Sequence, residues 1–424
     1  MSKSRSAGSD SRSPIRSSSL QPKAGFFLVL TGTIGNGISH WFIVWLIAVV
    51  FGVANLGSYS IVIAGATPIF IFLGLGLRNV YVSLREDPRW LDFLRWRLAG
   101  LSVAIVIFAI YCSVASAQWE IFLGVAVMKV SDGLLDIALA RLQRQGRFAA
   151  LGALTTANAA LTIAATSIVS RTSAPVELML VCAGLISLAV GIVAVLLGLQ
   201  LRAQGPVGYA VGWRKIITAA LPMTLSGGLM SLIASVPVWF LTAYSTPHEV
   251  GRFAGFAYLL VAANLFGASA QTILITSYRR LLSLHGVATL IRTMTRHILF
   301  IALCGVPLVA AVVLFGGPLL AYIYGPAFGA SLLELLALGS AAVMCILGYL
   351  NSAAILVLNW YQSQLIITVA SLLGATLPLL ISIAVGATQW VLIAALAMTS
   401  AYVIRYFTAH LLLRSRRVLR YVPA

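Results

Sequence analysis

The chain has 424 residues, of which 60% are hydrophobic and only 9% charged, and its mean hydropathy is +1.00. A soluble domain of this composition would have a largely apolar surface, so the composition excludes one and predicts an all-α polytopic membrane protein. The formal net charge of +18 is also typical of nucleic-acid-binding proteins, but the positions of the charges account for it without nucleic acid.

Residues 1–24 are rich in Ser and Arg and lack apolar periodicity, so we expect a disordered basic tail. The apolar run that begins at Gly25 is too long for a signal peptide, and no small-residue cleavage site follows it. Because basic residues beside a first span favour the cytoplasm, the N-terminus is predicted to lie inside.

Apolar runs of membrane-spanning length recur along almost the whole remaining chain. They predict twelve transmembrane helices, at residues 25–51, 57–77, 98–117, 119–140, 148–170, 176–201, 216–244, 251–277, 297–317, 330–357, 363–386 and 388–413. The expected domains are an N-terminal six-helix bundle and a C-terminal six-helix bundle, joined by a cytoplasmic linker and followed by a basic tail, at 25–201, 216–413, 202–215 and 414–424 respectively.

Lys and Arg are distributed unevenly between the two sides of this predicted membrane protein. With the N-terminus inside, 25 of the 28 basic residues fall in cytoplasmic tails and loops, and Arg97 and Arg405 are counted among them. Arg171 and Arg252 fall outside, and Lys129 lies within the membrane. The pattern follows the positive-inside rule, predicts a cytoplasmic C-terminus, and makes a nucleic-acid partner unnecessary.

Two predicted cytoplasmic loops, 85–97 and 279–297, combine Arg with Leu and Trp at helical spacing. Helices of this kind lie on anionic leaflets, so anionic phospholipid is an expected partner at the cytoplasmic face. The outer loops are short, and the chain has no DxD, HExxH or GxSxG motif. We therefore expect neither an enzyme nor catalytic residues.

The four cysteines lie in separate predicted spans and show no CxxC or Cys/His spacing, which predicts packing residues and no metal or cofactor.

The two halves of the chain overlay without gaps at a constant offset of 194 residues. The matching positions are Val44-Trp45, Gly57 and Arg85 in the first half and Val238-Trp239, Gly251 and Arg279 in the second. Because six spans return the chain to the side where it began, the halves share one orientation. They are expected to form two bundles related by a pseudo-two-fold axis along the membrane normal, with a cleft between them, as in transporters.

The fourth predicted span contains three charges in the run MKVSDGLLDIAL. At 100° per residue, Lys129, Asp132 and Asp136 lie on one stripe of the helix. Each unpaired charge near the membrane centre costs about 2.5–3.5 kcal/mol to insert, so the stripe must face protein or water. One interpretation is a Lys–Asp pair within the helix, with Asp136 answering Arg141 or Arg144. The other is that Lys129 attracts an anionic head group and Asp132 or Asp136 binds a coupling cation or proton.

Further polar residues at membrane depth are candidates for substrate binding. Amides commonly join transmembrane helices by hydrogen bonds, a histidine there commonly packs, and an Arg can simply mark a helix end, so a structural role stays open for each. With Lys129, the predicted substrate-binding residues are Asn36, His40, Arg78, Asn264 and Gln271.

Three segments resemble a known family. VWLIAVVFGVANLGSYSIVIAGATPIFIFLGLGLRNVYVS and LPMTLSGGLMSLIASVPVWFLTAYSTPHEVGRFAGFAYLL resemble the start of each half of bacterial polysaccharide-lipid flippases of the O-antigen type, and IYGPAFGASLLELLALGS resembles that family's entry into the tenth span. The family belongs to the multidrug/oligosaccharidyl-lipid/polysaccharide exporter superfamily. The matched positions are scaffold residues, so the resemblance assigns no binding residue.

The resemblance implies a flippase of the bacterial inner membrane. It would move an undecaprenyl-pyrophosphate-linked oligosaccharide from the inner to the outer leaflet for O-antigen, capsule or exopolysaccharide assembly. A polysaccharide polymerase or glycosyltransferases are the implied protein partners. A cation-coupled exporter of drugs or metabolites on the same fold is the alternative, because a fold does not determine its substrate.

Overall fold

The computed structural model describes residues 21–84, 88–115, 118–203, 209 and 212–415, and these residues are almost entirely helical. The N-terminal half contains α1 (Gln21–Leu46), continued by a π-helical turn (Ile47–Phe51), then α2 (Val53–Leu73), α3 (Leu77–Ser83), α4 (Trp90–Val114), α5 (Trp119–Arg144), α6 (Phe148–Val169) and α7 (Val176–Ala203). The C-terminal half contains α8 (Trp213–Tyr244), α9 (Pro247–Tyr324), the short helix Pro326–Phe328, α10 (Leu332–Val357), α11 (Tyr361–Ala384) and α12 (Trp390–Arg414).

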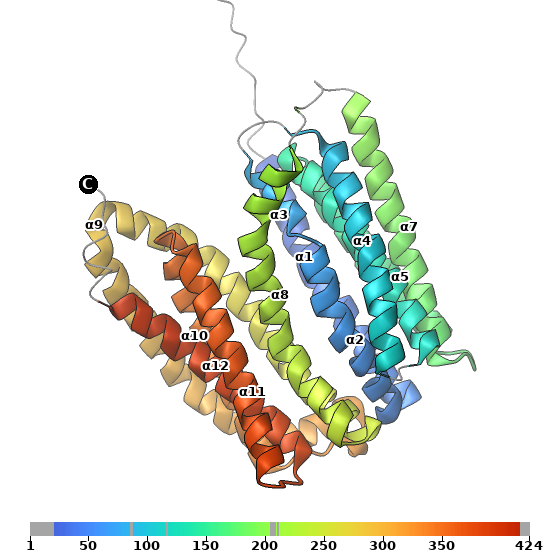
Figure 1. Ribbon diagram of the computed structural model, residues 1–424, viewed down its shortest axis with the longest axis vertical. Helices are drawn as coiled ribbons and strands as arrows, with labels where there is room; N and C mark the ends of the chain where they lie inside the picture. The colour runs from blue at the N-terminus through green and yellow to red at the C-terminus, as the bar shows by residue number, and fades with distance from the viewer. Residues whose placement is uncertain (1–20, 85–87, 116–117, 204–208, 210–211, 416–424) are drawn as a thin grey trace, which may run out of the picture.

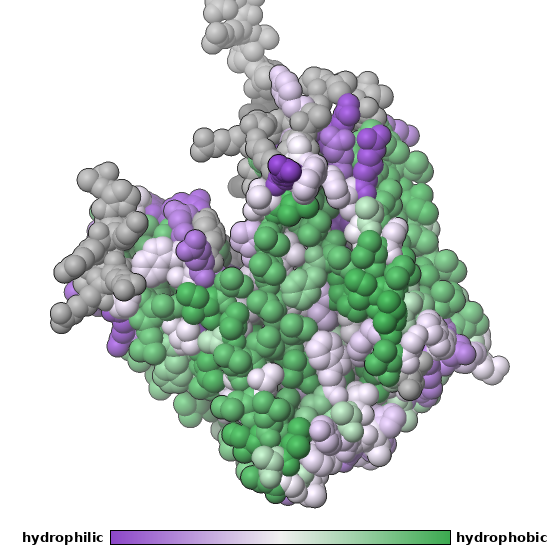
Figure 2. All heavy atoms as spheres, in the orientation of Figure 1, coloured by the Kyte–Doolittle hydropathy of each residue, from purple (hydrophilic) through white to green (hydrophobic). Residues whose placement is uncertain are grey.

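The predicted all-α polytopic fold is confirmed among the described residues. Ten helices are long and apolar enough to cross a membrane. One of them, α9, has 78 residues and bends at Gly286, where φ is +74°, and it covers both predicted spans 251–277 and 297–317. The 26-residue α5 covers the predicted span 119–140 but is not among the ten, because its charges make it less apolar. Exposed apolar side chains cover the middle of the visible face, and hydrophilic residues gather towards its ends (Figure 2).

The two interfacial helices expected in the cytoplasmic loops take a different form. Residues 90–97 are the first turns of α4, and residues 279–297 continue α9 through its bend at Gly286. Residues 85–87, like the N-terminal tail expected over 1–24, lie wholly or largely outside the described residues.

The helices form two lobes that splay apart from one end (Figure 1). We call the end where α2 and α9 begin the turn end, and the opposite end, where α1 begins and α7 and α12 finish, the tail end. Among the N-terminal helices α1 packs on α6 and α5 on α7, whereas α9, α10 and α12 pack on one another. Figure 2 shows the molecule hollowed between the lobes at the tail end.

Two glycines close the joint between the lobes at the turn end. A Cβ on Gly57 of α2 would overlap the carbonyl oxygen of Pro247, and a Cβ on Gly251 of α9 would overlap that of Val53. Both pairs are related by the same offset of 194 residues that the sequence repeat predicted. The pseudo-two-fold axis therefore passes between α2 and α9, and their backbones touch across it.

Helix α8 contacts both lobes. Near its start, Ile216 and Ala220 pack with Leu77 and Trp90 of the N-terminal half. Towards its end, Phe240 packs against helices α11 and α12. The two lobes are thus connected by α8 itself as well as by the linker that precedes it.

Candidate functional site

The charged stripe of α5 lies where helices α1 to α5 of the N-terminal lobe converge. Lys129 Nζ is 3.9 Å from Asp132 Oδ2, and the side chains remain 21% and 38% exposed. His40 of α1 interacts electrostatically with both charges, and Tyr59 of α2 with Asp132. Helices α1, α2 and α5 therefore contribute to one polar site, in which the Lys129 and Asp132 side chains are partly accessible.

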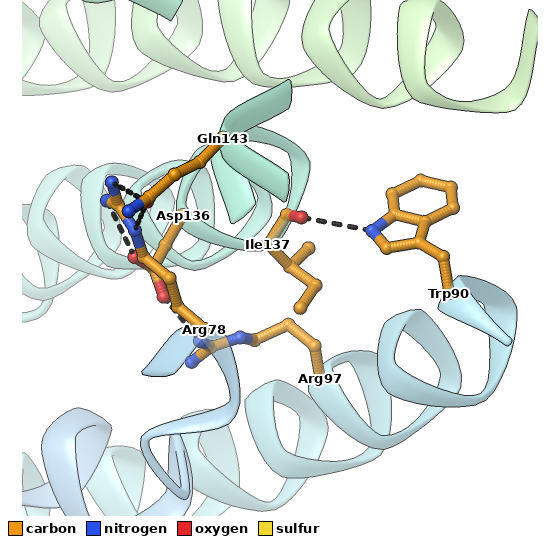
Figure 3. A network of polar contacts seen from close by, with 6 residues as sticks. All are labelled: Arg78, Trp90, Arg97, Asp136, Ile137 and Gln143. Atoms are coloured by element: carbon orange, nitrogen blue, oxygen red, sulfur yellow. Dashed lines mark hydrogen bonds and ion pairs between the residues drawn. The ribbon is translucent and has the colours of Figure 1, made fainter. Parts of the chain in front are cut away.

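Asp136 is held by two arginines, as Figure 3 shows. Arg97 Nη2 lies 2.6 Å from Asp136 Oδ2, and Arg78 Nη1 lies 3.3 Å from Oδ1. Arg78 also donates through Nε and Nη2 to the side-chain oxygen of Gln143. The Arg97 side chain is only 7% exposed, so its charge depends on this carboxylate. Asp136 is thus an anchor between α3, α4 and α5.

The sequence between α2 and α4 explains how Arg78 and Arg97 come to lie beside Asp136. At the end of α2 the chain turns through Leu75 and Gly76, both with positive φ, and α3 starts with Arg78 in its first turn. Gly74 leaves room for the Arg97 guanidinium, because a Cβ there would lie 2.7 Å from Nη1. The GLGLR segment therefore positions one arginine and makes space for the other.

The structure corrects the expectation that Asp136 answers Arg141 or Arg144. The Arg141 guanidinium lies over the Trp90 ring at 5.4 Å from its centroid, and Arg144 donates to the carbonyl oxygens of Tyr81 and Leu84. The Lys–Asp pair within the helix, the other part of that interpretation, is present.

The predicted binding residues divide into two groups. Asn36 and His40 on α1, Arg78 on α3 and the α5 stripe belong to the N-terminal lobe. Asn264 and Gln271 lie on α9 in the C-terminal lobe, both half-buried. Asn264 Oδ1 accepts hydrogen bonds from Tyr349 Oη at 3.1 Å and Cys345 Sγ at 3.3 Å, and its Nδ2 donates to Tyr402 Oη at 3.3 Å.

Sequence reasoning missed two buried arginines. Arg97 and Arg405 were counted with the cytoplasmic charges, but they are 6% and 3% exposed inside helices α4 and α12. A signal was present for Arg405, since it falls eight residues before the end of its predicted span. Arg97 gave no such signal, because α4 begins eight residues earlier than the predicted span. Among the described residues, no three His, Cys, Asp or Glu side chains gather as a metal site would require.

Comparison with known proteins identifies the fold. No family model matches the chain, and no curated protein sequence does. An inward-facing MATE multidrug transporter of the MOP superfamily is 14% identical with a TM-score of 0.65, and the alignment covers 93% of this chain and 96% of that one. An outward-facing MATE transporter is 15% identical with a TM-score of 0.62, covering 94% and 96%.

A third structure is the lipid II flippase MurJ in an inward closed conformation. It is 13% identical with a TM-score of 0.67, and the alignment covers 93% of this chain and 87% of that one. The chain therefore has the fold shared by MOP-superfamily transporters and this flippase.

Proposed function

We propose that this chain is an alternating-access flippase that moves an undecaprenyl-pyrophosphate-linked oligosaccharide from the cytoplasmic to the outer leaflet for polysaccharide assembly. It would act in the bacterial inner membrane with both termini in the cytoplasm. The observation that carries the proposal is a charged, partly accessible site at membrane depth in a chain that shares its fold, over 93% of its length, with a lipid II flippase. The resemblance of the three sequence segments to O-antigen-type flippases points to the same class.

The physical task matches this architecture. A diphosphate and a hydrated glycan cannot cross about 30 Å of hydrocarbon unaided, because both lose their hydration. The lobes touch at the turn end and leave a hollow at the tail end. With the tail end in the cytoplasm, this is the conformation that would load a head group from the inner leaflet while the prenyl tail stays in lipid.

The stripe supplies two complementary roles. Lys129 is the proposed contact for the anionic head group, with Asn36, His40 and Arg78 as further contacts in the same lobe and Asn264 and Gln271 in the other. Asp132 is the proposed coupling site for a cation or proton, because among the described residues it forms only a long ion pair, 3.9 Å to Lys129. Asp136 is the second candidate, but both its oxygens are engaged by arginines, which favours Asp132.

A cation-coupled exporter of drugs or metabolites is the second candidate function. It is supported by the similarity to MATE multidrug transporters and by Asp132, which could hold an ion without any lipid-linked substrate.

The test is a strain that lacks this gene, complemented with wild-type, Lys129→Ala or Arg171→Ala protein. We expect the deletion to accumulate lipid-linked oligosaccharide on the cytoplasmic leaflet and the wild type to clear it. Lys129→Ala should fail although the protein reaches the membrane, because it removes the site's cation. Arg171→Ala is the matched control, since Arg171 is an exposed cation in the same lobe.

Complementation by Lys129→Ala would remove Lys129 from the binding site. A deletion strain with normal glycan export and altered drug tolerance would replace the flippase proposal with the exporter.

A further inference from the structure

The C-terminal lobe contains a buried cation that the proposed site does not use. The Arg405 side chain on α12 is 3% exposed, and its guanidinium lies 4.9 Å from the centroid of the Tyr349 ring. Its Nε and Nη1 atoms have no hydrogen-bond partner among the described residues. Arg405 lies nine residues, or about 13 Å, before Arg414 at the end of α12, so it sits well inside the span.

No acidic side chain among the described residues of this half of the chain lies near Arg405. From Trp213 to the C-terminus the sequence contains only two acidic residues, Glu249 and Glu334. Both are in the first turns of their helices at the turn end, and Glu334 is engaged by Arg252 at 3.6 Å. On α10, Glu334 precedes Tyr349 by fifteen residues, a rise of about 22 Å. Among the described residues of its lobe, Arg405 therefore has no acidic side chain as a counter-charge.

The groups around Arg405 are polar and come from three helices. Asn264 of α9, Tyr349 of α10 and Tyr402 of α12 are joined by the hydrogen bonds described above. Asn351 of α10 is also fully buried, donates through Nδ2 to the carbonyl oxygen of Tyr406 on α12, and leaves its Oδ1 without a partner among the described residues. An unpaired charge inside a membrane-spanning lobe is strongly disfavoured. The polar atoms gathered near Arg405 therefore indicate a site for an anion.

We propose that Arg405, with Asn264 and Tyr349, forms an anion site in the C-terminal lobe that binds a phosphate-type oxyanion. A guanidinium presents paired N–H donors that match phosphate oxygens, and here Nε and Nη1 are the unengaged ones. Resting on the proposed function, this oxyanion is the diphosphate of the lipid-linked substrate. The acids that could hold a coupling cation lie in the N-terminal lobe beside Lys129, so the anionic head group would contact cations of both lobes.

The test measures binding to the purified full-length protein in detergent. The probes are inorganic pyrophosphate and farnesyl diphosphate, with farnesol as the uncharged analogue, and the readout is calorimetry together with the ligand-induced shift in unfolding temperature. The variants are Arg405→Gln and Arg405→Lys. Arg414→Gln is the matched control, because Arg414 is an exposed cation on the same helix.

We expect diphosphate affinity to fall at least about tenfold in Arg405→Gln. It should fall several-fold in Arg405→Lys, which keeps the charge but loses the paired N–H donors of the guanidinium. It should not fall in Arg414→Gln. Farnesol affinity should be unchanged throughout. Binding of farnesyl diphosphate but not pyrophosphate would assign the site to a lipid-linked anion, and equal binding of both to the oxyanion alone.

Unchanged diphosphate affinity in either folded Arg405 variant, or an equal loss in Arg414→Gln, would overturn the site. If Arg405→Gln does not fold, Arg405→Lys decides. Arg405-dependent binding in a protein that fails to clear lipid-linked oligosaccharide would keep this site and reject the proposed function. Flipping that is unaffected by the substitution of Arg405 would keep the proposed function and reject this site.

Discussion

At the scale of single residues, the pairing of Asp136 with two arginines distinguishes it from Asp132. Both carboxylates belong to one helical stripe, and the sequence made each of them a candidate ion site. The contacts separate them, because Asp136 neutralises a nearly buried guanidinium whereas Asp132 is paired only at 3.9 Å. Removing one partner of a buried pair is far more costly than removing both, since it strands the other charge.

This asymmetry gives a stability prediction. Asp136→Asn should lower the free energy of unfolding by about 3 kcal/mol, because Arg97 keeps its charge without a carboxylate. Arg97→Gln should cost only about 1 kcal/mol, since Asp136 is 35% exposed and retains Arg78. The double variant should lose less than the sum of the two. Denaturant unfolding of the detergent-solubilised protein measures all three.

The control on the same helix is Arg95→Gln. Arg95 is 74% exposed and lies 3.9 Å from Asp92, so its removal should change stability by less than about 0.5 kcal/mol. Equal losses for Asp136→Asn and Arg97→Gln would show that the pair is solvated and that Asp136 is available to bind an ion.

At the scale of elements, the contact between α2 and α9 makes Gly57 and Gly251 equivalent. We expect Gly57→Ala and Gly251→Ala each to separate the lobes at the turn end, because a Cβ would overlap a backbone oxygen that cannot rotate away. The distance between spin labels at the exposed residues 173 and 388 should increase in both variants and by similar amounts. Double electron–electron resonance measures that distance.

Gly227→Ala is the matched control for this prediction. It also adds a methyl group facing α2, but at an ordinary contact distance of 3.7 Å from Ile71 Cγ2. The reciprocal contact would be contradicted if the label distance increased as much in Gly227→Ala. It would also be contradicted if the distance increased in only one of Gly57→Ala and Gly251→Ala.

At the scale of the whole molecule, the orientation in the membrane decides the direction of the proposed transport. Without Arg97 and Arg405, which are buried, the remaining basic residues still follow the predicted distribution. In a protein cleared of its own cysteines, Ser173→Cys should react with an impermeant thiol reagent in intact cells, whereas Gln145→Cys should react only after permeabilisation. Both positions are exposed and flank α6. The opposite pattern would invert the membrane orientation and with it the proposed direction of flipping.

The sequence predicted the all-α polytopic fold and the repeat register well because both depend on patterns along the chain. Hydropathy follows from composition over about 20 residues, and the glycine register follows from a constant offset. The fate of individual charges was less predictable. Whether an arginine near a helix end is solvated or buried depends on partners distant in sequence, such as Asp136 for Arg97, or on the absence of any acid in the same lobe, as for Arg405.

At the turn end the backbones of α2 and α9 touch at Gly57 and Gly251, among buried apolar side chains such as Leu56 and Phe253. The backbone part of this contact immobilises no rotamers, so it carries little of the entropic penalty that orders longer side chains. Among the described residues no ion pair joins α2 to α9, so the contact rests on dispersion between closely packed atoms and offers salt no charge pair to screen. The proposed alternation between the two open states should therefore be insensitive to the ionic strength of the external medium.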